Sequence, residues 1–265
     1  MRFQTVALMV SLLGAWSSGQ NATNLKHTTE AGRLAPLLEN LGNLHVPVTT
    51  SSADTQRYFG QGVRLIYAFN HAEALRSFRE AARSDDRCAM AYWGQALALS
   101  PNINDSAIGP DREQLGCDAI REAVRRKASA GEKEQALIDA LQARFAGKLS
   151  EGERAKLNAA YAGAMRRIWS RFPNDPDVAT LYADAVMNMR PWECWTKDGK
   201  PQPGIADARA ALEQTIRLYP DHPGAHHAYI HLMEASDEVD LATPSADRLG
   251  SLMPGAGHLV HMRAC

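Results

Sequence analysis

Apolar and small residues recur at helical spacing from Ser51 onward, and no stretch shows the period-two alternation of a half-buried strand. In the segment FGQGVRLIYAFNHAEALRSFREAARSDD, small Gly62 lies in a first predicted helix. Ala74, Phe78 and Ala81 follow at spacings of four and three in a second predicted helix. Small residues let two helices approach closely while the aromatic ring fills the gap. The pattern therefore predicts an all-α fold built from helix pairs.

The helix-pair pattern repeats along the chain. Pro220 and Pro254 each close a second helix and lie 34 residues apart, whereas Pro176 precedes Pro220 by 44 residues. The difference predicts an insertion of ten residues, and the Pro/Gly-rich stretch RPWECWTKDGKPQPG at 190–204 accounts for it. The repeats indicate an α-solenoid with four complete helix pairs and a fifth, incomplete unit that begins at Gly255.

The remaining segments are predicted from their composition. Residues 1–20 contain an early basic residue, an apolar run and small residues, which is the layout of a signal peptide removed near Ser18 to Gln20. A membrane anchor is the alternative, but the apolar run is short for a bilayer span. Residues 21–50 are expected to form a linker with a short helix around 34–41, followed by the repeat array over 51–262 and a tail at 263–265. The expected location is export, secreted or periplasmic.

The predicted array ends on an unpaired first helix, HLVHMRAC, whose apolar side lacks a neighbouring helix. Two explanations remain open. Either a partner covers this open helix, or the sequence is a shortened version of a longer protein, which we favour.

Composition narrows the classes of partner. The 265 residues are 45% hydrophobic and carry a net charge of −1, so there is no electrostatic footprint for nucleic acid or for an anionic membrane. The four cysteines show no CxxC spacing, and the fold is expected to be held together by packing and not by disulfides. We expect neither nucleic acid nor, after signal removal, a membrane as partner.

Six of the nine histidines fall between residues 222 and 262. His227, His231 and Glu234 share one face of a predicted helix, and His258 and His261 share a face of the next first helix. Neighbouring first helices line the concave side of such a solenoid, so the two faces are expected to lie opposite one another.

Imidazoles converging from two helices can bind a transition metal, because two histidines at i and i+4 can share one ion. The nitrogen-rich set suits copper, zinc, iron or nickel, and Glu234 is a candidate catalytic base or further ligand. The competing interpretation is that the histidines contact a peptide or make structural hydrogen bonds. No nucleophile motif and no HEXXH motif is present, so the sequence leaves open whether the protein is an enzyme.

Other polar residues gather where first helices turn into second helices. They are Asn70, His71, Asn102, Asn104, Asn188 and Arg190. Helix capping is the default interpretation, because asparagine favours turns and helix ends. The functional interpretation is a rim that orients a peptide, protein or small-molecule ligand in the concave groove, with Arg190 as an anion contact and Trp192 as a lid.

Five phrases of the chain resemble a group of exported-looking tetratricopeptide-repeat proteins. These are FNHAEALRSFREAA, ALSPNIN, MNMRPWECWTKDGKPQPG, YPDHPGAHHAYIHLMEAS and ADRLGSLMPGAGHLVHM, and the resemblance covers about residues 44–262. The resemblance implies a tetratricopeptide α-solenoid but no particular activity. In that group the last phrase continues into a proline, a small residue and a third histidine, where this chain has Arg263, Ala264 and Cys265. The second histidine face is therefore expected to be incomplete.

Overall fold

The computed structural model describes residues 32–147 and 152–262, and within these ranges the regular structure is helical. The predicted signal peptide at 1–20 and the tail at 263–265 lie outside the described residues. The α-helices are α1 (Ala53–Tyr67), α2 (His71–Ser84), α3 (Ala89–Leu99), α4 (Pro110–Arg126), α5 (Glu132–Gln142), α6 (Glu153–Arg171), α7 (Pro176–Met187), α8 (Ile205–Leu218), α9 (Pro223–Met233), α10 (Thr243–Leu252) and α11 (Gly257–His261). None of the described helices is long and apolar enough to cross a membrane.

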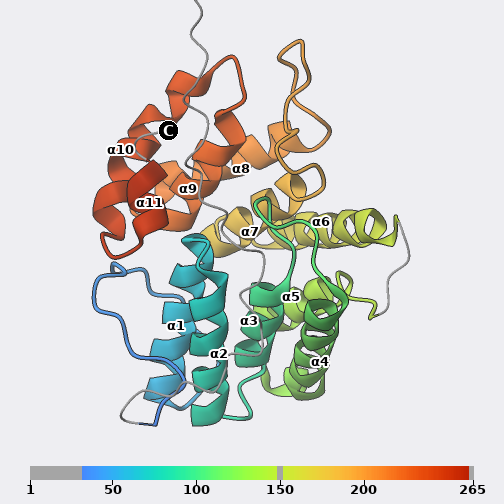
Figure 1. The fold of residues 1–265 in the computed structure, drawn as a ribbon, viewed down its shortest axis with the longest axis vertical. Helices are drawn as coiled ribbons and strands as arrows, with labels where there is room; N and C mark the ends of the chain where they lie inside the picture. The colour runs from blue at the N-terminus through green and yellow to red at the C-terminus, as the bar shows by residue number, and fades with distance from the viewer. Residues whose placement is uncertain (1–31, 148–151, 263–265) are drawn as a thin grey trace, which may run out of the picture.

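Consecutive helices pack side by side through the described chain, and first helices also contact across pairs, α1 with α3, α3 with α5, and α7 with α9. This arrangement confirms the all-α solenoid of helix-turn-helix pairs (Figure 1). The described residues contain five complete pairs, from α1–α2 to α9–α10, so the expectation of four was wrong. The irregular 100–111 stretch lies inside the pair α3–α4 and does not end it. Helix α11 begins the incomplete last unit.

Phe78 explains why the first repeat packs closely. Its ring lies between Gly62 on α1 and Gly94 on α3, and a Cβ atom added to Gly62 would lie 2.6 Å from the Phe78 ring. The side chain of Phe78 is fully buried. Glycine at both positions lets a single aromatic ring fill the space between three helices, as the sequence pattern predicts for the first pair.

Residues 32–52, the described part of the segment before α1, contain no helix, so the short helix expected around 34–41 was wrong. Side chains of the first helix pair accept hydrogen bonds from backbone amides of this segment. Leu34 N–H donates to the Glu80 carboxylate (2.9 Å), and Leu38 N–H donates to Gln61 Oε1 (2.7 Å). Leu41 is buried against the core. Backbone amides that have side-chain acceptors need no intrahelical partner, so the segment is stable without a helix.

The insertion between α7 and α8 lies where the sequence predicts it, from residue 188 to 204. Trp195 fixes it to the array, because its indole N–H donates to the carbonyl of Leu232 on α9 (2.7 Å). The described cysteines, Cys88, Cys117 and Cys194, are buried free thiols. Packing therefore holds this part of the chain together, as expected.

The two ends of the described array touch. Helix α1 contacts α9, and Figure 1 shows α9 and α11 beside the blue end of the ribbon that contains α1. Two small cavities, of about 40 and 30 Å³, lie near this contact. The histidine-rich helices therefore face the first repeat as well as each other.

Candidate metal centre

Three histidines from two helices bring their ring nitrogens together. His227 Nε2 lies 3.0 Å from His231 Nε2, one turn further along α9, and 3.1 Å from His258 Nε2 on α11. One nitrogen of each ring lies within 4.8 Å of the other two. Two imidazole nitrogens bound to one tetrahedral ion at about 2.0 Å stand about 3.3 Å apart. The two separations from His227 are therefore close to those between ligands of one metal ion, and the nitrogens of His231 and His258 lie within 4.8 Å of each other.

The opposite nitrogens of two of these rings have acceptor partners. His227 Nδ1 lies 2.7 Å from the backbone carbonyl of Tyr67, and His231 Nδ1 lies 2.8 Å from Glu234 Oε1. A carbonyl and a carboxylate accept hydrogen bonds, so each Nδ1 carries the proton and each neutral ring presents an Nε2 lone pair. Two lone pairs facing each other at 3.0 Å repel unless a cation lies between them. Such orienting partners are typical of metal-binding histidines.

The electrostatics of the cluster favour unprotonated rings. Burial and the neighbouring His231 and His258 hold the pKa of His227 well below its usual range. Burial and its neighbours His231 and His261 also lower the pKa of His258. A neutral imidazole is the form that binds a metal, so neither ring needs to lose a proton near pH 7 before binding.

The start of α9 is fixed by a small polar network. His222 caps the helix, with Nδ1 accepting from the Ala225 N–H (3.0 Å) and Nε2 lying 3.2 Å from Asp177. The Tyr67 hydroxyl donates to the same Asp177 carboxylate (2.6 Å). Gly224 makes the approach possible, since a Cβ there would lie 2.6 Å from the Tyr67 ring. The network holds α9 against the end of α1, where the Tyr67 carbonyl meets His227.

Phe69 covers the histidine cluster on the α1 side. Its ring centroid lies 4.4 Å from that of His227, 5.4 Å from His231 and 5.5 Å from His258, and it is stacked on the last two. The residue has a φ of 54°, in the left-handed region that bulky side chains rarely adopt. Backbone strain of this kind concentrates at functional sites. Sequence reasoning missed Phe69 because nothing in the pattern of the turn indicates its backbone conformation.

The other predicted members of the cluster are placed around it. His261 is exposed on α11 and is not among the three rings whose nitrogens converge. The Glu234 carboxylate lies against Nδ1 of His231, so in this geometry Glu234 orients one of the candidate metal-binding histidines. Trp192 is 54% exposed, and its ring is nearly perpendicular to that of His231 (87°), with centroids 5.6 Å apart.

The other two histidines near the start of α9, His222 and His226, have structural partners. His226 contacts Ser245 on α10 through Nδ1 (2.9 Å) and the carbonyl of Pro220 through Nε2 (2.9 Å). His222 lies in the turn and caps α9. Both side chains are buried outside the converging trio.

Several residues of the predicted rim act as caps. Asn70 accepts from the Glu73 N–H at the start of α2, and Asn102 accepts from the N–H groups of Asn104 and Asp105. Asn188 donates to the carbonyl of Asp184 at the end of α7. The capping interpretation therefore holds for these three asparagines. Asn104 and Arg190 are exposed.

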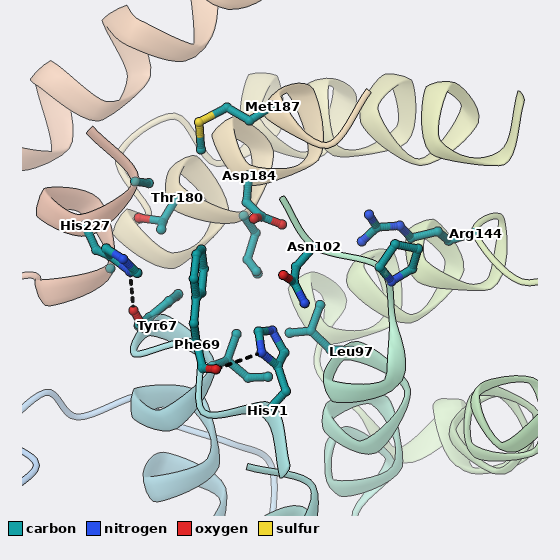
Figure 2. Close-up of a pocket in the computed structure, with 15 residues that line it drawn as sticks. Tyr67, Phe69, His71, Leu97, Asn102, Arg144, Thr180, Asp184, Met187 and His227 are labelled. Atoms are coloured by element: carbon teal, nitrogen blue, oxygen red, sulfur yellow. Dashed lines mark hydrogen bonds between the residues drawn. The ribbon is translucent and has the colours of Figure 1, made fainter. Parts of the chain in front are cut away.

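A cavity of about 40 Å³ adjoins the histidine cluster, with His227, His71 and Asn102 in its wall (Figure 2). His71 is oriented by a contact from Nδ1 to the Phe69 carbonyl (3.2 Å). Its pKa is lowered to about 4, mainly by burial and also by the charge of Arg112. Of the predicted rim, His71 and Asn102 thus line this cavity together with His227, and Trp192 lines a smaller one with His231 and Glu234.

Comparisons with known proteins add little to this geometry. No protein-family model matches the chain, and no curated protein matches it. Among solved structures, MamA 41-end from Desulfovibrio magneticus RS-1 aligns with a TM-score of 0.37 and 12% sequence identity, over 78% of this chain and 98% of that one. The interpretation of the site therefore depends on its own residues.

Proposed function

We propose that this protein is an α-solenoid that binds one transition metal ion through His227, His231 and His258, with Glu234 orienting His231. The observation that carries the proposal is the convergence of Nε2 atoms whose rings are held by acceptors on their other nitrogens. A cation between the Nε2 atoms would be coordinated by the lone pairs that otherwise repel one another. The all-nitrogen donor set suits zinc, copper or iron.

Three protein ligands leave a coordination position open, which distinguishes catalytic metal sites from closed structural ones. When bound, the ion would supply Lewis acidity or redox chemistry to water or dioxygen. Phe69 excludes solvent from one side of the triad, and Glu234 keeps the proton of His231 on Nδ1. The cavity beside His227 is small, which favours a small substrate over a peptide.

The direct test is the metal content of protein purified without a histidine tag. We expect about one ion per chain by elemental analysis, either as isolated or after reconstitution with zinc, copper or iron. The double substitution His227→Ala/His231→Ala should abolish this binding. Replacement of the exposed His45 by alanine, a matched control outside the cluster, should leave it unchanged.

The alternative is a scaffold without metal chemistry that binds a peptide or partner protein. It predicts no stoichiometric metal in the wild type even after reconstitution, and equal residual metal in the double variant. That result would overturn the metal proposal. A metal that binds but supports no turnover with dioxygen or hydrolytic substrates would instead restrict the function to metal binding.

We also propose that the chain is exported, on the basis of the signal-peptide pattern in residues 1–20. Expression of the full chain and mass spectrometry of its mature N-terminus test this. We expect the first residue to lie just after the Ser18 to Gln20 region. An intact N-terminus on protein recovered from the cytoplasm would contradict export.

A further inference from the structure

Arg144, just beyond the end of α5, is a fully buried cation with an unused donor. Its side chain is 1% exposed, and its Nη2 atom has no hydrogen-bond partner among the described residues. Nε donates to Asn158 Oδ1 at 3.2 Å, and the guanidinium lies over the Tyr161 ring, 4.8 Å from its centroid. These contacts fix the guanidinium and leave one edge directed into the cavity described above.

The buried charge of Arg144 has no ion-pair partner within the described part of the chain. Asp184 lies in the same cavity wall and attracts Arg144, but the two side chains form no ion pair. Burial raises the pKa of Asp184, whereas the positive charge of Arg144 lowers it. Burying a charge without an ion-pair partner costs free energy. An anion bound next to Arg144 would therefore stabilise the folded protein.

Asn102 supplies a second donor in the same wall. Its Oδ1 accepts from the N–H groups of Asn104 and Asp105, which leaves the amide nitrogen for the cavity. Figure 2 shows Asn102 between His71 and Arg144, with Arg144 at the end opposite His227. The Arg144 end thus combines a charged donor with a neutral donor.

The rest of the cavity wall is largely apolar, and the cavity itself is small. Leu97, Leu181 and Met187 line it together with the Phe69 ring. Its volume of about 40 Å³ has room for roughly three or four water-sized groups, at about 10–15 Å³ each. A ligand of about four non-hydrogen atoms with one anionic end and one apolar end matches both the size and the lining.

We propose that this cavity binds a small aliphatic monocarboxylate of the size of acetate or propionate. The carboxylate accepts from Arg144 Nη2 and from the Asn102 amide, and the alkyl end packs against Leu97 and Met187. A planar carboxylate suits an arginine donor fork better than a larger tetrahedral anion does in a space of this volume. The site requires no metal, so it goes beyond the proposed metal-binding function.

The test is titration of metal-free protein with ¹³C-labelled acetate and propionate, followed by NMR at constant ionic strength. We expect saturable binding of one carboxylate per chain, and weaker binding of sulfate. Arg144→Met should weaken acetate binding at least about tenfold, because a hydrogen bond from a charged donor is lost. Arg167→Met, the same change at an exposed position on α6, is the matched control.

A second variant guards against misfolding of Arg144→Met. Asn102→Asp keeps the oxygen that caps the turn and places a carboxylate in the cavity, so it should also weaken acetate binding without unfolding the chain. The proposal is overturned if acetate and propionate fail to bind the folded wild type, or if they bind Arg144→Met and Asn102→Asp as tightly as the wild type. The His231→Ala/His258→Ala variant removes two metal ligands that do not line this cavity, so it should still bind acetate, which separates failure here from failure of the metal site.

Discussion

His227 Nδ1 lies 2.7 Å from the backbone carbonyl of Tyr67, a residue 160 positions earlier in the chain. The bond joins the last turn of α1 to the middle of α9. It fixes the protonated nitrogen of His227 and directs the other nitrogen toward His231 and His258. Contact between the first and fifth helix pairs is therefore a condition for the candidate metal site, so substitutions at that contact should affect metal affinity and stability together.

Gly224→Ala tests this coupling. The added Cβ would lie 2.6 Å from the Tyr67 ring and would push α9 away from α1. We expect a loss of about 1–3 kcal/mol in the free energy of unfolding, as for overpacked cores, together with weaker metal binding. Chemical denaturation and metal titration measure the two effects. Gly250→Ala in α10 is the control, since a Cβ there meets no atom within 4 Å, and it should be neutral or stabilising.

Glu234→Ala tests the orientation of His231. Without the carboxylate, the Nδ1 proton of His231 loses its acceptor and the ring is free to turn. We expect metal affinity to fall about 10- to 100-fold, the usual effect of removing a residue that orients a ligand. Competition with a chelator of known affinity gives the value. Glu193→Ala removes an exposed carboxylate in the insertion between α7 and α8, and an equal loss in that variant would argue against a specific role for Glu234.

The sequence predicts the parts of this structure that depend on local pattern. Helical spacing places His227, His231 and Glu234 on one face of α9, and the repeat places His258 on the next first helix. Close packing around Phe78 follows from its small neighbours in the sequence.

The remaining features depend on contacts that no local pattern encodes. The contact between α1 and α9 arises from the curvature accumulated over the whole solenoid, so Tyr67 could not be identified as a partner of His227. The segment before α1 has an amphipathic pattern, but side chains of Glu80 and Gln61 decide against a helix there. The burial of Arg144, in contrast, is indicated by the sequence. Arg144 follows Leu137 and Leu141 at helical spacing, so a charge occupies a position of the apolar face.

Phe69→Asn tests whether the aromatic ring protects the metal. Asparagine tolerates the left-handed backbone at this position, so the turn between α1 and α2 should survive while the ring is lost. We expect release of the bound metal to a chelator to become about tenfold faster, because water reaches the triad from the α1 side. Stopped-flow chelation measures the rate. An unchanged rate in a folded variant would show that Phe69 only fills space.

His71→Gln tests the acid sensitivity of the fold. The pKa of His71 is about 4 in the folded chain, against about 6.5 in an unfolded one. Between these values the unfolded chain binds more protons, so stability falls as the pH drops from about 6.5 toward 4, by at most about 3 kcal/mol for this group. The glutamine variant should lose less stability than the wild type across that window, measured by urea unfolding at each pH. If the free energies of unfolding of the two proteins fall in parallel as the pH drops, His71 does not contribute to acid unfolding.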